Sequence, residues 1–173
     1  QGNKNETRVT AAQTLMKRVR EIKKRSPQTA IVATGDFNVI ETNRPDPFFS
    51  VVENGRNSLT DVHKYFMDSK DIDYKIKYTY PLGTYFYSKG MTWNLLDRFF
   101  ISEDLKDGKG LELELSSYKI YAPSFMTTQH KYNKYKTDNH YGSVVEVFLI
   151  AMITKQAIVI KQVTLTISLL SYH

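Results

Sequence analysis

The sequence predicts an α/β protein in which helices flank a mixed β-sheet, and three observations point to this class. An amphipathic stretch from Glu6 to Arg25 leads into the continuous apolar run 30–37, "AIVATGDF". A second apolar segment at 94–102, "NLLDRFFIS", carries an acid among apolar neighbours. The segment 111–123, "LELELSSYKIYAP", alternates with the period of a strand. A helix followed by a buried strand is the order found in layered α/β proteins.

The composition limits the chemistry that the chain can support. Its 173 residues are enough for one domain with a substantial core. Because there is no Cys, a disulfide framework and a thiolate metal site are excluded, and any metal would be held by oxygen or imidazole. The net charge of +6 and the pI near 9.3 favour polyanionic partners such as nucleic acid or anionic lipid, although the Lys residues are scattered.

We expect no targeting or membrane-spanning segment in this chain. The opening "QGNKNETRVT" is polar and begins without Met, which suggests an internal point of a longer protein or a processed start. The last thirty residues are mostly apolar or β-branched, but Glu146, Lys155 and Lys161 interrupt them too often for a membrane span. Strands are therefore expected there, and the sequence specifies no cellular compartment.

The first predicted element is a helix from Glu6 to Arg25. Its apolar residues recur at spacings of three and four, which places them on one helical face, and the basic residues lie mostly opposite as a solvated exterior. "SPQT" ends this helix. The run 30–37 then predicts a strand that is buried on both sides.

The remaining elements are shorter. A short helix is predicted at 47–55 with a stop at Gly55, and one or two helical turns at 58–69. The alternating segment 74–93 predicts a pair of strands around Pro81–Gly83, and segments 94–102 and 111–123 predict two more strands. Residues 127–141 are predicted to be a polar, aromatic-rich loop.

The first predicted strand ends in "GDFN", which places Asp36 and Asn38 at its carboxyl end, where α/β sheets bind ligands. Residues two apart in a strand point to the same side. A carboxylate there can bind a hard cation or take a proton from water, and an amide can donate to a phosphoryl oxygen. An Asx turn at the strand end would require the same residue types for backbone reasons, so both interpretations stay open.

"GDFN" after an apolar strand resembles the endonuclease/exonuclease/phosphatase family, the metal-dependent phosphoesterases that include DNase I and abasic-site endonucleases. The strand "WNLLDRFFIS" with Asp97 is a second match, and a helix containing Arg8 precedes the first strand as it does in the family. The resemblance implies part of a DNase I-like four-layer α/β sandwich. Residues 1–147 would be the C-terminal portion of such a domain, and residues 148–173 an atypical apolar tail.

The resemblance also implies roles for individual residues. Asp36 would activate or orient the attacking water and bind metal, and Asn38 would contact the scissile phosphate. Asp97 would orient a partner His or support the metal site, although it is alternatively a buried acid paired with Arg98 or capped by backbone amides. We expect Asp36, Asn38 and Asp97 to face one shallow cleft. The implied cofactor is Mg²⁺ or Mn²⁺, with the main metal-binding Glu outside this chain.

The family's Ser-Asp-His motif is not present in this sequence. The nearest candidates are Asp138 as a metal ligand and His140 as a catalytic residue, in "KTDNHYGSVVEV". Either they form a rearranged substitute, or the motif was lost just before Val144, which we favour and which makes His140 a loop residue outside the cleft. His63 and His130 have polar neighbours in sequence and are expected on the surface.

These observations predict metal-dependent phosphodiester hydrolysis, with nucleic acid as the leading substrate. Two alternatives stay open: a phosphomonoesterase or lipid phosphodiesterase, and a catalytically inactive remnant that binds polyanions weakly. The missing Glu and Ser-Asp-His favour the inactive remnant. The tail 148–173 is interpreted either as sequence from an altered reading frame or as an extra hairpin that covers the sheet.

Overall fold

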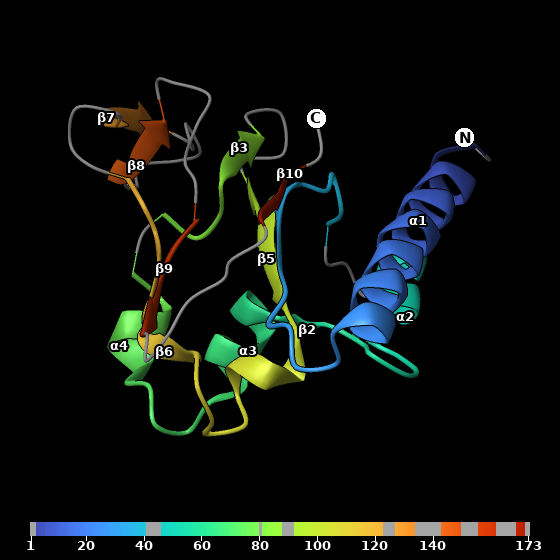
Figure 1. The fold of residues 1–173 in the computed structure, drawn as a ribbon. Coiled ribbons are helices and arrows are strands. Elements are labelled where there is room, and N and C mark those ends of the chain that lie inside the picture. Colours follow the sequence, from blue (N-terminus) through green and yellow to red (C-terminus); the bar gives the residue numbers. More distant parts are fainter. Residues whose placement is uncertain are drawn as a thin grey trace.

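The computed structural model describes residues 3–40, 46–79, 81–87, 92–122, 127–133, 143–149, 156–161 and 169–171, and it describes side chains within 5–122. The elements in chain order are α1 Asn3–Arg25, β1 Val32–Asp36, α2 Pro47–Val52, β2 Thr60–Asp61, α3 Val62–Asp68, α4 Tyr74–Lys77, β3 Tyr85–Tyr87, β4 Thr92–Asn94, β5 Asp97–Ile101, the 3₁₀ helix η1 Glu103–Leu105, β6 Glu112–Ile120, β7 Thr127–Asn133, β8 Ser143–Leu149, β9 Gln156–Lys161 and β10 Leu169–Ser171 (Figure 1). Within these ranges, none of the helices has the length and apolar character that crossing a membrane requires.

The central sheet has four strands in the order β10-β1-β5-β2 and is mixed. Strand β1 pairs parallel with β10 and antiparallel with β5, in a register that runs from Val32 opposite Ile101 to Asp36 opposite Asp97. Three further two-stranded sheets, β3-β4, β6-β9 and β7-β8, are antiparallel. The predicted class is therefore confirmed at the level of a mixed α/β protein with flanking helices.

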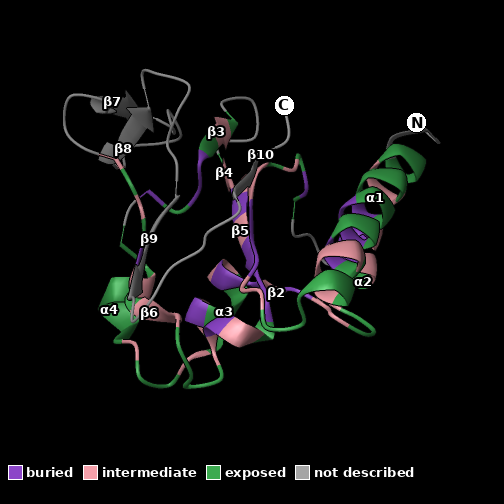
Figure 2. Cartoon of the chain, in the orientation of Figure 1, coloured by how far each residue is buried: buried purple, intermediate pink, exposed green. Residues whose placement is uncertain are grey.

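One face of the central sheet is covered by α1 and α2, which lie together beside β1 and β5 (Figure 1). Successive strand residues alternate between faces, so Ala33 and its partner Phe100 both point to this side. The core on this side consists of Ala12, Leu15, Met16, Val19, Ile31, Ala33, Val39, Phe48, Phe49, Val52, Leu59 and Phe100. Figure 2 shows this burial along β5 and the inner side of α1.

The opposite face of the sheet packs against α3, η1 and β6. Val32 and Ile101 point to this side and form a second core with Val62, Phe66, Leu105 and Tyr118. Helices α3 and α4 each begin with an acid that caps them: the Asp61 carboxylate accepts from the His63 amide at 2.9 Å, and the Asp73 carboxylate accepts from the Lys75 amide at 2.7 Å.

The structure confirms most of the predicted elements. Strands β1, β5 and β6 and helices α2 and α3 lie within the predicted segments, and helix α1 ends at Arg25 as predicted but begins at Asn3, before the predicted Glu6. Gly55 follows α2 with a φ of +87° that favours glycine. In the tail, β8, β9 and β10 are strands as expected.

The prediction of a strand pair around Pro81–Gly83 was wrong for the first strand, whereas the second half of the segment does contain strand β3. Residues Tyr74–Lys77 form helix α4 instead of a strand, because Asp73 caps its first turn and four residues are too few for alternation to decide the backbone. The hairpin consists of β3 and β4, and Gly83 lies against β4: a Cβ there would lie 2.6 Å from the Asn94 carbonyl oxygen.

The predicted loop at 127–141 is corrected in its first half. Residues 127–133 form β7, which pairs antiparallel with all seven residues of β8. A polar strand is stable here because the apolar β8 provides its hydrogen-bonding partner, which the composition of the segment did not reveal. The second half of the predicted loop, 134–141, lies outside the described residues.

Candidate functional site

The structure places Asp36 and Asp97 directly opposite each other at one end of the central sheet. Directly opposed residues of an antiparallel pair have Cα atoms about 4.5–5.5 Å apart and side chains on the same face. By the alternation along β1 and β5, this is the face of Val32 and Ile101. Asp36 is exposed and Asp97 is half-buried, so the two carboxylates lie where the inner strands β1 and β5 end near solvent.

Asn38 lies in a turn rather than in the strand. Strand β1 ends at Asp36, and Asn38 has a φ of +52°, a left-handed conformation that Asn tolerates better than most residues. Its backbone amide donates to Oδ1 of Asp36 at 2.9 Å, which is the Asx turn that the sequence left open. Because the chain turns here, the period of two no longer relates the Asp36 and Asn38 side chains, and this step of the prediction is corrected.

The backbone on both sides of Asp97 is held by Thr84, a buried residue that precedes β3. Its Oγ1 accepts from the amides of Leu96 and Asp97, each at 3.1 Å. The Phe37 amide donates to the Leu96 carbonyl at 3.0 Å, which ties the end of β1 to the same point. These bonds fix the two strand ends that carry the carboxylates.

Asp36 and Asn38 also line a small hollow of about 250 Å³ between α1 and the end of β1. Arg8 of α1 lines it too, and its Nη1 lies 2.8 Å from Oδ2 of Asp46, the buried residue that caps α2. Arg8 therefore joins α1 to α2 beside the hollow. Asp97 is not among the residues that line this hollow, so a single cleft shared by Asp36, Asn38 and Asp97 stays a prediction.

The sequence did not indicate a buried ion pair that lies next to Asp97 in β5, on the opposite face of the sheet. Arg98 and Asp61 have side-chain exposures of 1% and 0%, and the Arg98 guanidinium donates to the Asp61 carboxylate. The guanidinium also lies over the Phe49 ring, 4.9 Å from its centroid. Burial raises the pKa of Asp61 above its ordinary value, an effect that Arg98 opposes. Because the partners are 37 residues apart, no local pattern indicated them.

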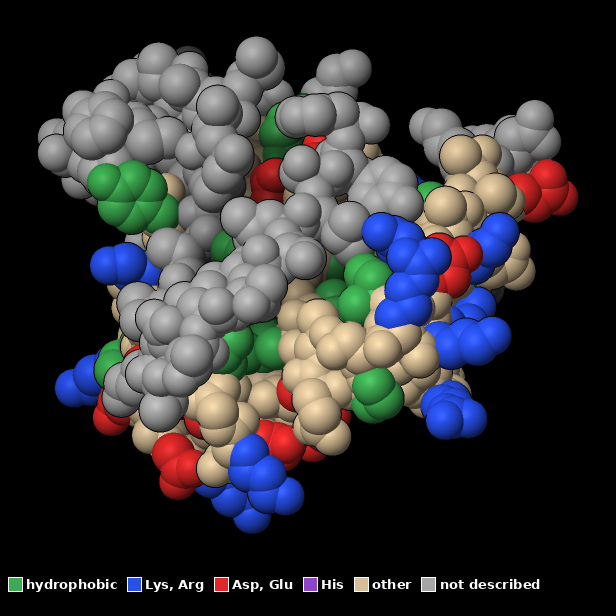
Figure 3. All heavy atoms as spheres, in the orientation of Figure 1, with side chains coloured by type: hydrophobic (Ala, Val, Ile, Leu, Met, Phe, Trp, Pro, Cys, Tyr) green, Lys and Arg blue, Asp and Glu red, His purple; other side chains and the backbone are tan. Residues whose placement is uncertain are grey.

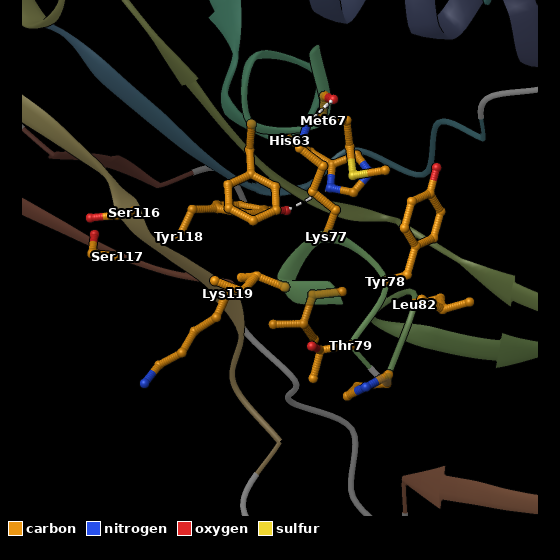
Figure 4. Close-up of a pocket in the computed structure, with 14 residues that line it drawn as sticks. His63, Met67, Lys77, Tyr78, Thr79, Leu82, Ser116, Ser117, Tyr118 and Lys119 are labelled. Carbon is orange, nitrogen blue, oxygen red and sulfur yellow. Dashed lines mark hydrogen bonds between the residues drawn. The ribbon is translucent and has the colours of Figure 1, made fainter. Parts of the chain in front are cut away.

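A larger cavity of about 560 Å³ lies between α3, the segment 76–82 and β6 (Figure 4). His63 lines it and its Nδ1 lies 3.0 Å from the Tyr118 hydroxyl. The prediction that His63 is a surface residue is corrected: its side chain is half-buried, because it packs against Tyr118 of β6.

The donor set fits only part of a metal site. In the ranges with described side chains, no group of three or more His, Cys, Asp or Glu is arranged to hold a metal ion. Asp36 and Asp97 supply two opposed carboxylates. Because Mg²⁺ keeps several waters and is held by one or two carboxylates together with substrate phosphates, this pair fits the protein side of an incomplete magnesium shell.

The remaining candidates lie outside the described residues. Asp138 and His140 belong to the segment 134–142, and the His130 side chain lies outside the described side chains although its backbone is in β7. Their predicted positions stay predictions.

Comparison of the chain with protein-family models, with curated proteins and with solved structures finds no match.

Proposed function

We propose that this chain carries part of a Mg²⁺- or Mn²⁺-dependent phosphodiesterase site, on a portion of a DNase I-like four-layer sandwich, with nucleic acid as its substrate class. The observation that supports this proposal is the register of β1 and β5, which sets Asp36 opposite Asp97 at the exposed end of the sheet. The pairing of β1 with β5 brings together two acids that are 61 residues apart in the sequence.

Each residue has a chemical role in this proposal. The Asx turn uses Oδ1 of Asp36, so we assign Oδ2 to the cation or to the attacking water. Asn38 donates its side-chain amide to a phosphoryl oxygen without adding negative charge. Asp97 supplies the second carboxylate, and the hydrogen bond from its backbone amide to Thr84 Oγ1 holds it in place. A bound divalent cation would supply charge neutralisation at the phosphate and a more acidic water.

Nucleic acid is favoured over a lipid or a phosphomonoester by the charge of the chain. The net charge is +6, and the exposed side of α1 carries Lys17, Arg18, Arg20, Lys24 and Arg25. Figure 3 shows Lys and Arg side chains gathered over this helix at one edge of the molecule. A row of cations on a helix attracts the phosphate backbone without reading its sequence.

A second candidate is polyanion binding without hydrolysis. It is favoured by the lack of a three-ligand metal group among the described side chains and by the same basic side of α1. Binding of this kind weakens steeply with salt, whereas it does not depend on Asp36.

The test is cleavage of plasmid DNA and short oligonucleotides with Mg²⁺, comparing the wild-type chain with Asp36→Asn. This change keeps an acceptor for the Asn38 amide and removes the charge, so the turn is preserved. We expect any cleavage by the wild-type chain to fall by about 100-fold or more in the variant.

The matched control is Asp107→Asn. Asp107 forms the same kind of turn, accepting from the Lys109 amide at 2.9 Å in an exposed loop, and its replacement should leave cleavage unchanged. Equal cleavage by wild type and Asp36→Asn contradicts hydrolysis at this site. Salt-dependent DNA binding by both proteins would then support the binding module.

A further inference from the structure

The 560 Å³ cavity between α3, segment 76–82 and β6 is of the size that small-molecule sites have, about 300–1,000 Å³. It is separate from the Asp36–Asp97 pair, since neither acid lines it. Most of its wall is apolar or aromatic, contributed by Phe66, Met67, Ile76, Tyr78, Pro81 and Ile120. An apolar wall with a few convergent polar groups is the usual composition of a binding site.

The β6 side of the cavity is shaped by an irregularity in the pairing of β6 with β9. Glu114 lies opposite Val159 and Lys119 opposite Ala157, so five steps along β6 correspond to two along β9. The extra residues form a bulge, stabilised by the Ser117 hydroxyl donating to the Glu114 carbonyl at 2.6 Å. Tyr118 lies in this bulge and is only 4% exposed, between the half-buried Ser117 and the exposed Lys119. Bulges re-aim side chains in this way.

The bulge directs Tyr118 to His63 on the facing helix. The hydroxyl of Tyr118 and Nδ1 of His63 are 3.0 Å apart, and the Tyr118 ring packs on Phe66 with centroids 4.9 Å apart. Figure 4 shows the His63 and Tyr118 side chains converging on the cavity from α3 and β6. A hydrogen-bonding pair surrounded by aromatic rings suits a flat molecule with one polar group.

The charged side chains that line the cavity disfavour a cationic ligand. Two Lys and one His are among the residues that line the cavity, and none of these lining residues is Asp or Glu. The Lys77 ammonium donates to the Met67 carbonyl at 2.8 Å and also to the Ser69 carbonyl. Lys119 extends away from the His63–Tyr118 pair in Figure 4.

We propose that this cavity binds a small aromatic molecule that is neutral or anionic, with its polar group hydrogen-bonded to the His63–Tyr118 pair. The bulge of β6 presents the Tyr118 hydroxyl to this ligand, and the apolar wall of the cavity contacts the aromatic ring of the ligand. The site is independent of the carboxylate pair and of any hydrolysis there.

The test is calorimetric titration of the full chain at pH 7.5 with three probes of matched shape: 2-naphthol, 2-naphthoate and 2-naphthylmethylammonium. The neutral and anionic probes should bind with a Kd of about 1 mM or tighter, as expected for ligands of this size. The cationic probe should bind at least about tenfold more weakly. No measurable heat from any probe, or equal affinity for all three, would overturn the proposal.

Variants locate the binding. Tyr118→Phe removes one hydroxyl and keeps the ring on Phe66, so it should weaken 2-naphthol binding about three- to tenfold, the usual effect of one hydrogen bond. The matched control Tyr121→Phe changes an exposed Tyr three residues along the chain and should bind as wild type does. Thr79→Trp, which places a large ring in the wall, should weaken binding at least about tenfold.

Circular dichroism confirms that each variant is folded before titration. Unchanged affinity in the folded Tyr118→Phe protein contradicts the proposal, whatever the outcome with Thr79→Trp.

Discussion

The two faces of the central sheet differ in how completely they are closed, and β5 shows the contrast within two consecutive residues. Arg98 points to the α1–α2 face, where it is 1% exposed and paired with Asp61. Asp97 precedes it and points to the opposite face, at the open end of the sheet beside Asp36. On the first face the rings of Phe37, Phe48, Phe49 and Phe100 pack with centroids 5.0–6.3 Å apart. The second borders a cavity of about 560 Å³.

This difference indicates that one face serves mainly stability and the other carries the candidate binding groups. Dense aromatic packing and a fully buried ion pair fill most of the first face, and the hollow of about 250 Å³ lies at its margin, between α1 and the end of β1. The other face keeps polar groups near water, namely the carboxylate pair at the sheet edge and the His63–Tyr118 pair in the cavity. Substitutions on the first face should therefore affect folding, and those on the second should affect binding or chemistry.

The largest effect is expected for Asp61→Ala on the closed face. It leaves the Arg98 charge buried without its carboxylate and removes the cap of α3, so the free energy of unfolding should fall by about 3–5 kcal/mol. Urea unfolding followed by circular dichroism measures this. The double variant Asp61→Leu/Arg98→Met, which removes both charges, should recover most of the loss. If the double variant is as unstable as the single one, buried charge is not the cause.

A matched pair of Phe substitutions compares the packing of the two faces. Phe48 is 2% exposed among three other rings on the closed face, and Phe66 is 4% exposed beside the cavity on the other. Phe48→Ala should cost about 3–5 kcal/mol, and Phe66→Ala about 1 kcal/mol less, because Phe66 already borders open space. Chemical unfolding of both variants in one buffer gives the difference. Equal costs would show that the cavity is closed by other groups in solution.

The smallest effect is expected at the junction between α1 and the segment after β5, where Lys23 pairs with Asp104. Burial raises the pKa of Asp104, but hydrogen bonds from Lys23 and Ser102 outweigh it and lower the pKa below its ordinary value of 3.8. The folded state then binds fewer protons than the unfolded state. The stabilisation is present above about pH 4 and is lost as the pH falls through the lowered pKa.

Lys23→Gln should therefore destabilise the chain by about 1 kcal/mol or less at pH 7, and the difference from wild type should shrink below pH 4. Unfolding midpoints measured between pH 7 and pH 3 give this profile. Lys24→Gln is the matched control, since Lys24 is the exposed neighbour on the same helix. A difference that grows toward low pH would contradict the assignment to Asp104.

Long or strongly periodic segments were predictable from the sequence. In α1 the residues Ala12, Leu15, Met16 and Val19 recur at helical spacing, and all are at most 3% exposed. Short or ambiguous segments were not. The four residues of α4 match a strand pattern as well as a helix, and only the Asp73 cap separates the two. The residues "GDFN" suit both a ligand site and an Asx turn, so the sequence did not decide between these two interpretations.

By itself, the sequence determined the longer elements and the placement of Asp36 at the end of an apolar strand, because side-chain period and turn residues act over a few neighbouring positions. Only the tertiary structure decided which partners meet. The register of β1 with β5, the Arg98–Asp61 pair and the contact of His63 with Tyr118 join residues far apart in the chain. Such pairs are selected by the packing of whole faces, since a shift of one residue in register would turn every side chain to the other side.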